Sequence, residues 1–179
     1  CMQRLSAVAT ITNIYAKAIE HTSAKVLDTR KTTPGLRHLE KWAVTLGGGM
    51  NHRVGLYDMI MLKDNHIDFA GGIEKAITQT KAYLKETGRD LKIEVETRSI
   101  DEVNQVIAVG GIDRIMLDNF TTAETLEAVK LIDGRYEIES SGGITIETLK
   151  DYAESGVDFI SVGALTHSAG SLDISLKAI

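Results

Sequence analysis

The sequence has little of several residue types, and each shortage excludes a class of protein. Its one cysteine, Cys1, excludes an internal disulfide and a cysteine-based metal site, and this scarcity suits a reducing compartment. It has no apolar run of about 18 residues that could span a bilayer, and no basic stretch followed by an apolar segment typical of a signal peptide. We therefore expect a cytoplasmic protein without a membrane partner.

Positive charge is also scarce. The 20 Lys and Arg residues are outnumbered by 25 Asp and Glu residues, which gives a formal net charge of -5. A protein that coats nucleic acid needs a broad excess of positive charge. We therefore expect no nucleic-acid partner, and any anion-binding site must be a local cluster.

Signals for an internal domain boundary are missing. The chain has a single proline, Pro34, and no linker rich in serine and glycine. With 43% hydrophobic residues, 179 residues can bury one substantial core, so we expect a single domain over 1–179. The chain passes from Cys1–Arg4 directly into a helical pattern, and we expect it to be a fragment of a longer two-domain protein.

Short runs rich in β-branched residues alternate with amphipathic stretches. The predicted strands are 25–28, 59–62, 93–96, 114–117, 136–139 and 159–162. Between most of them, apolar residues recur at helical spacing, for example at Val103, Val106 and Ile107. This alternation predicts an α/β fold, a parallel sheet covered by helices.

The second half of the chain repeats regularly. Glu96, Asp118, Ser140 and Val162 follow one another at intervals of 22 residues, each near the end of a predicted strand. A repeated strand–helix unit is easier to place around a barrel than in an open sheet whose strand order must reverse. We expect an incomplete TIM-like α/β barrel of six or seven parallel strands, with an open doubly wound sheet as the alternative.

Basic residues gather where predicted strands end, which is where barrel enzymes carry their working residues. They would form a cationic pocket on an acidic protein, suited to a small substrate with several carboxylates or phosphates. These residues are Arg30, Lys31, His52, Arg53, Lys63 and, less directly placed, His66.

Two further groups suit a phosphorylated sugar. Glu96 and Asp118, on neighbouring strands at equivalent positions, can hold sugar hydroxyls or a divalent cation. The turn Ser141–Gly143 leads into a helix predicted to start near Thr145, and Gly163 opens another turn; such glycine turns ahead of helices bind phosphate.

Some of these residues also have purely structural interpretations. Gly47–Gly49 is either a helix C-cap or a binding loop. For His167, phosphate contact and simple packing stay equally open. Trp42 and Tyr57 lie in apolar contexts and are predicted to be core or helix-packing residues rather than ring-stacking contacts.

The motifs taken together resemble those of quinolinate phosphoribosyltransferase, also called nicotinate-nucleotide pyrophosphorylase (carboxylating). The resemblance extends from about Gln3 to the end of the chain. The matching segments are Asp28–Arg37, Gly47–Gly49, Asn51–Arg53, Gly55–Leu56, Leu62–His66, Glu94–Glu96, Leu117–Asn119, Ser140–Gly143, Gly156–Asp158 and Ser161–Ser168.

The resemblance implies an N-terminal α/β sandwich followed by an incomplete barrel, of which only the barrel is present here. It also implies a homodimer or larger homo-oligomer, in which a neighbouring subunit's sandwich domain closes the barrel mouth. The implied reaction is phosphoribosyl transfer from phosphoribosyl pyrophosphate to quinolinate with loss of CO2, giving nicotinate mononucleotide for NAD synthesis, with Mg2+ as cofactor.

The resemblance also implies roles for individual residues. Quinolinate would be bound by Arg30, His52, Arg53 and Lys63. Phosphoribosyl pyrophosphate would be bound by Lys31, Glu96, Asp118, Ser141, Gly142, Gly163 and His167. The catalytic group would be Lys31, Lys63, Glu96 and Asp118, with Glu96 and Asp118 near Mg2+.

Two rival functions stay open at this point. One is a paralogue with the same barrel and another heteroaromatic acceptor, although the pair Arg30 and Arg53 favours a substrate with two carboxylates. The other is a non-catalytic sensor of nucleotides or sugar phosphates.

Overall fold

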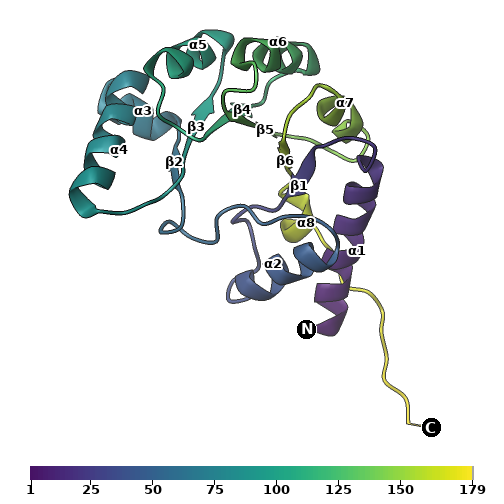
Figure 1. Ribbon diagram of the computed structural model, residues 1–179. Coiled ribbons are helices and arrows are strands. Elements are labelled where there is room, and N and C mark those ends of the chain that lie inside the picture. Colours follow the sequence, from purple (N-terminus) through teal and green to yellow (C-terminus); the bar gives the residue numbers. More distant parts are fainter. Residues whose placement is uncertain (179) are drawn as a thin grey trace.

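The computed structural model describes residues 1–178 and shows one six-stranded parallel sheet with helices packed around it (Figure 1). The strands are β1 (Lys25–Leu27), β2 (Ile60–Leu62), β3 (Ile93–Thr97), β4 (Arg114–Asp118), β5 (Glu137–Ser141) and β6 (Phe159–Ser161). Each predicted strand is present, with its ends within two residues of the prediction.

The sheet order is β1-β6-β5-β4-β3-β2. Neighbours follow chain order from β2 to β6, and β1 closes against β6, so the order nowhere reverses as it would in a doubly wound sheet. β1 and β2 do not pair with each other, and a single bridge between Leu27 and Met50 continues the sheet beyond β1. The fold is therefore a barrel left open between its first two strands, and the alternative topology is excluded.

The helices that follow β2 to β5 lie around the outside of this arc (Figure 1). All the helices of the described residues are α1 (Met2–Ala18), α2 (Arg37–Leu46), α3 (Asp64–Ala70), α4 (Ile73–Thr87), α5 (Ile100–Val109), α6 (Thr122–Ile132), α7 (Leu149–Glu154) and α8 (Ala164–His167). Among residues 1–178, no helix is both long and apolar enough to cross a membrane.

Strand alternation explains why the core lies outside the barrel and the polar groups inside it. Side chains of one parity, such as Val95, Ile115 and Ile138, are buried in the hydrophobic core shared with the helices. Side chains of the other parity include Glu94 and Arg114, which are also buried. The barrel interior is therefore charged, and its charges must be paired there.

Two aromatic residues do not pack as predicted. Trp42 is 57% exposed and Tyr57 is 63% exposed. Trp42 lies on the outward face of α2, whose buried face is formed by residues such as Ala43 and Val44. The apolar neighbours of both aromatics in the sequence did not reveal which way each side chain points.

Candidate active site

A cavity of about 780 Å³ opens at the carboxyl ends of the strands, and every residue to which the resemblance assigned a role lines it. The lining includes Arg30, Lys31, His52, Arg53, Lys63, Glu96, Asp118, Ser141, Gly142, Gly163 and His167. They come from segments after every strand, and the curvature of the sheet brings these segments to one mouth. The cavity size suits a small-molecule ligand.

Positive charges concentrate on the side of the cavity near β1 and β2. Arg30 and Lys31 follow β1, Arg53 lies in the loop before β2, and Lys63 is the N-cap of α3. Burial and the nearby charge of Arg30 lower the pKa of Arg53 from its ordinary value. Cations that repel one another in this way favour a ligand with more than one negative charge.

Carboxylates face these cations from β3 and β4. Lys63 Nζ donates to Glu96 Oε2 at 2.8 Å. Burial, and then the charge of Glu96, raise the pKa of Asp118. Lys63 balances the negative charges of these two carboxylates only in part. Such a pair suits a hard divalent cation, so the donor set fits Mg2+.

The strand register corrects the predicted equivalence of these two carboxylates. Glu96 pairs with Met116, so Asp118 lies two residues farther along its strand. It is Ser141 that pairs with Asp118, because Ser140 pairs with Leu117. Ser140 is buried with the core-facing residues, whereas Ser141 lines the cavity.

The glycine turn after β5 has a conformation that only glycine adopts readily. Gly142 has φ of 103°, and a Cβ placed there would lie 2.2 Å from Asn119 Oδ1. The turn is followed by the helix α7, but that helix starts at Leu149 and not near Thr145 as predicted, because Thr145–Thr148 forms turns of its own. Gly163 is the N-cap of the short helix α8.

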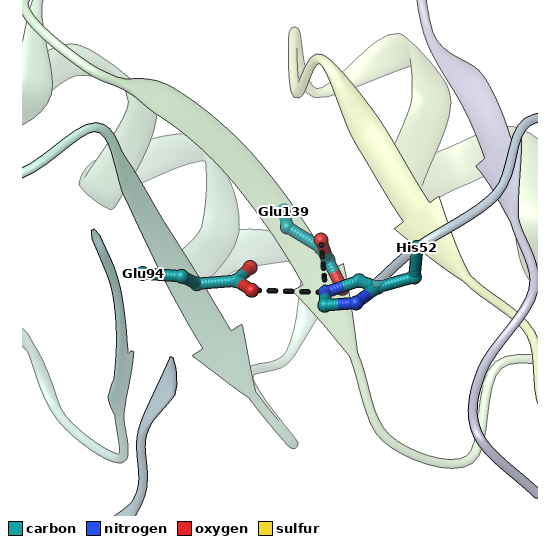
Figure 2. Close-up of side chains that lie close together, drawn as sticks. All are labelled: His52, Glu94 and Glu139. Carbon is teal, nitrogen blue, oxygen red and sulfur yellow. Dashed lines mark hydrogen bonds and ion pairs between the residues drawn. The ribbon is translucent and has the colours of Figure 1, made fainter. Parts of the chain in front are cut away.

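His52 belongs to a buried ionic cluster beneath the cavity (Figure 2). Its Nε2 lies 2.9 Å from Glu94 Oε2 and 3.4 Å from Glu139 Oε2. Burial alone would lower the pKa of His52, but hydrogen bonds and charges from Glu139 and Glu94 outweigh it and raise the pKa to about 9. Burial and the charge of Glu139 raise the pKa of Glu94 to about 7. The cluster therefore retains protons at neutral pH that separate groups would release.

This cluster has the donor types of a metal site, but Arg114 already supplies a cation there. Arg114 Nη1 donates to Glu139 Oε2 at 2.9 Å and lies 4.0 Å from Glu94 Oε1. The hydroxyl of Ser161 also donates to Glu139. A guanidinium at this distance repels a metal ion, so we interpret the cluster as a self-contained ion network.

Of the remaining candidates, His66 and Gly47–Gly49 have structural roles, and His167 faces the cavity. His66 Nδ1 accepts from the backbone N–H of Lys63 at 3.0 Å and so caps α3, outside the large cavity. Gly47 is the C-cap of α2, and Gly47–Gly49 does not line the cavity. His167 lines the cavity, with Nδ1 2.7 Å from Ser168 Oγ, and is therefore within reach of a ligand in the cavity.

Sequence reasoning missed several buried partners of the site. Glu139 and Arg114 were passed over, although strand alternation places Glu139 and Ser141 on one face of β5. Lys41 was also missed, because a lysine in an amphipathic helix is usually an exposed residue.

Comparisons with known proteins agree with this geometry. Residues 8–177 match the family model described as quinolinate phosphoribosyl transferase, C-terminal domain. The chain is 48% identical to the nicotinate-nucleotide pyrophosphorylase [carboxylating], chloroplastic, of Arabidopsis thaliana, covering 98% of this chain and 54% of that protein. It is 46% identical to the probable nicotinate-nucleotide pyrophosphorylase [carboxylating] of Bacillus subtilis, covering 98% of this chain and 59% of that protein.

A solved structure shows the same arrangement. The crystal structure of NadC from Streptococcus pyogenes superimposes with a TM-score of 0.92 at 46% sequence identity, covering 98% of this chain and 60% of that one. The chain thus spans about half the length of the curated relatives it matches. On the match over nearly its whole length, the chain belongs to the quinolinate phosphoribosyl transferase family and corresponds to its C-terminal domain.

Proposed function

We propose that this barrel carries out phosphoribosyl transfer from phosphoribosyl pyrophosphate to quinolinate, with release of pyrophosphate and CO2 and formation of nicotinate mononucleotide. The observation that supports this most directly is that one cavity combines a cationic side, a carboxylate side and the glycine turn after β5. That division suits a dicarboxylate acceptor next to a phosphorylated sugar. Names of the relatives agree with this activity.

Binding of the acceptor would orient it for reaction. Arg30, Arg53 and Lys63 pair with the two carboxylates of quinolinate, and the ring nitrogen then faces C1 of the ribose, a positioning effect. His52, whose charge is balanced within its buried cluster, would support this pocket by accepting the Arg53 N–H. The geometry of two carboxylates on one ring is what distinguishes quinolinate from a monocarboxylate such as nicotinate.

At the ribose, the bond between C1 and pyrophosphate breaks as the bond from the ring nitrogen to C1 forms. C1 gains positive character in this step, and Glu96 and Asp118 stabilise it. Lys31 lies beside the leaving group, while Ser141, Gly142 and Gly163 hold the 5-phosphate with His167 near them. Glu96 and Asp118 would also hold Mg2+, which when bound supplies charge neutralisation for pyrophosphate.

Decarboxylation then needs little from the protein. The ribosylated ring nitrogen is positive, so it stabilises the electron pair left on the adjacent ring carbon when that carbon's carboxylate leaves as CO2. A proton from water completes the product. This scheme uses charge placement more than acid or base catalysis.

The full-length protein is the right material for a first test. With quinolinate, phosphoribosyl pyrophosphate and Mg2+, we expect equal amounts of CO2 and nicotinate mononucleotide. Glu96→Gln and Asp118→Asn should each lower kcat by about 100-fold or more, because each removes charge at the reacting centre. Asp113→Asn is the matched control, since that carboxylate accepts the Ile93 N–H at the opposite end of the barrel.

Other results would favour the rivals. Equal use of nicotinate and quinolinate would indicate a paralogue with another acceptor. Tight binding of the nucleotide product without turnover would indicate a sensor. Near-normal kcat in both carboxylate variants would contradict the charge-stabilising role.

We also propose a homodimer or larger homo-oligomer in which a neighbouring subunit completes the cavity. The support is the open edge between β1 and β2 and the exposed apolar side chains of Leu56 and Phe69. Sedimentation of the intact protein tests this.

The cytoplasm stays the proposed compartment, although the names of plant relatives place those proteins in chloroplasts or mitochondria.

A further inference from the structure

The peptide groups around His52 are held by two charged residues that do not line the cavity. Asp28, which follows β1, accepts the His52 N–H through Oδ1 at 2.8 Å. Lys41, on α2, donates from Nζ to the His52 carbonyl oxygen at 2.9 Å and also to Asp28 Oδ1. The ion pair thus holds the N–H and the C=O of the same residue.

Asn51 adds two hydrogen bonds to this arrangement. When its amide is oriented so that the nitrogen faces the nearby acceptors, it donates to Asp28 Oδ2 at 2.6 Å and to the Lys41 carbonyl oxygen at 2.9 Å. Asp28 is then surrounded by donors from α2 and from the Asn51–His52 segment. Three parts of the chain that are distant in sequence meet at one carboxylate.

Burying this ion pair costs desolvation free energy, so it is a poor way to stabilise a core. Asp28 is 0% exposed and Lys41 is 2% exposed. Burial raises the pKa of Asp28 to about 6 and lowers the pKa of Lys41, so the environment disfavours both charged forms even though each partner supports the other. Apolar side chains of similar volume in place of a buried ion pair are often at least as stable. The role of the Asp28–Lys41 pair is therefore better explained by the backbone geometry that it imposes.

The segment that it holds is not part of a helix or strand, and Arg37 holds its later part by donating to the Val54 carbonyl oxygen at 3.1 Å. Residues 51–58 form neither helix nor strand, yet they carry Arg53, whose guanidinium lines the cavity and donates to the Met59 carbonyl oxygen at 3.2 Å. The Arg53 N–H donates to His52 Nδ1 at 2.7 Å. The placement of Arg53 therefore depends on His52, and the placement of the His52 backbone depends on Asp28 and Lys41.

We propose that Asp28 and Lys41 are positioning residues that fix the His52–Arg53 segment and thereby set the affinity of the cavity for its dicarboxylate acceptor. This inference rests on the proposed function for the identity of that acceptor. It predicts an effect on quinolinate and little effect on phosphoribosyl pyrophosphate, whose predicted contacts, apart from Lys31, lie on or after β3 to β6.

The test compares Lys41→Met with the double variant Asp28→Asn/Lys41→Met in the intact protein. Lys41→Met leaves a buried carboxylate without its cation and should lower stability. The double variant removes both charges, so stability should return toward that of the unmodified protein, while the His52 carbonyl still lacks its donor. We expect quinolinate to bind about tenfold or more weakly in both variants, with affinity for phosphoribosyl pyrophosphate within about twofold.

A matched control is Asp158→Asn, which alters a carboxylate that accepts the Ile138 N–H at 2.8 Å at the other end of the barrel. It should change neither affinity. If the double variant regains both stability and quinolinate affinity, the ion pair is only structural and the proposal is wrong. Equal weakening of both substrates would also overturn it.

Failure of the proposed function can be told apart from failure of this inference. If the unmodified protein binds no quinolinate, the proposed function has failed. Hydrogen exchange of the backbone amides of residues 52–58 then still decides the positioning role. Faster exchange in the double variant than in the Asp158→Asn control supports positioning, and equal exchange contradicts it.

Discussion

At the scale of single residues, the glycine turn after β5 is the most sharply constrained part of the cavity. Gly142 has positive φ, and a Cβ there would lie 2.8 Å from the backbone nitrogen of Asn119 as well as 2.2 Å from its side chain. Asn119 itself has φ of 58° and donates its N–H to the Ser141 carbonyl oxygen at 2.8 Å. The two turns therefore fit together only if residue 142 has no side chain.

Gly142→Ala should accordingly displace both turns and weaken binding of phosphoribosyl pyrophosphate by about tenfold or more, because backbone N–H groups would leave their phosphate-binding positions. Calorimetric titration of the intact protein measures this. Gly134→Ala is the control, because Gly134 also has positive φ, at 68°, but open space around it. A similar loss of affinity in the control would mean that backbone strain alone, and not the contact with Asn119, is responsible.

At the scale of elements, α3, α5 and α6 each begin within four residues of a strand end, and side-chain capping at the start of each helix fixes the loop that connects it to the strand. α6 begins after Thr121, whose hydroxyl accepts the Glu124 N–H at 3.3 Å, while the Glu124 side chain accepts the Thr121 N–H at 2.8 Å. This capping box starts the helix at Thr122, three residues after Asn119, so it connects the helix directly to the carboxylate side of the cavity.

Thr121→Ala should lower the free energy of unfolding by about 1 kcal/mol, because the cap hydroxyl no longer accepts an orphan N–H. Denaturant unfolding measures the change. Thr122→Ala, one residue into the same helix, is a suitable control and should change stability much less. Because Ala has the higher helix propensity, loss of the same amount in both variants would contradict the capping role of Thr121.

At the scale of the whole molecule, three buried groups have raised pKa values in the folded protein: Asp28 at about 6, Glu94 at about 7 and His52 at about 9. A raised folded-state pKa means that the folded protein holds the proton more tightly than the unfolded chain. Each contribution is therefore fully present below the unfolded pKa and is lost as the pH rises through the folded value. Between pH 7 and 9 the group that titrates in this way is His52.

The free energy of unfolding should thus fall as the pH is raised from 7 to 9. Glu139→Gln should flatten this decrease, because it removes the carboxylate most responsible for raising the pKa of His52. Denaturant unfolding at several pH values measures the slope, and NMR titration of the His52 ring measures its pKa. Glu154→Gln, which breaks the exposed pair with His21 at 3.0 Å, should keep the slope of the unmodified protein. An unchanged slope in Glu139→Gln would contradict this account.

Local patterns were sufficient to predict much of this molecule. The six strands, their parallel pairing and the clustering of Arg30, Lys63 and Asp118 at one end of the sheet follow from β-branched runs, helical spacing and the polarity of strand ends. These signals are local in the chain, and the parallel fold itself brings the strand ends together.

What only the tertiary structure decided depends on register and on contacts between distant residues. Pairing of Asp118 with Ser141 instead of Ser140 was not readable from the regular spacing, because a shift of one residue reverses the face of a strand. The ion network of His52 with Glu94 and Glu139, and the reach of Lys41 back to Asp28, join segments that no local pattern relates. The sequence by itself determined the strand–helix alternation and the residues of the cavity, whereas the strand order and register, set by contacts between distant residues, decided which buried charges support them.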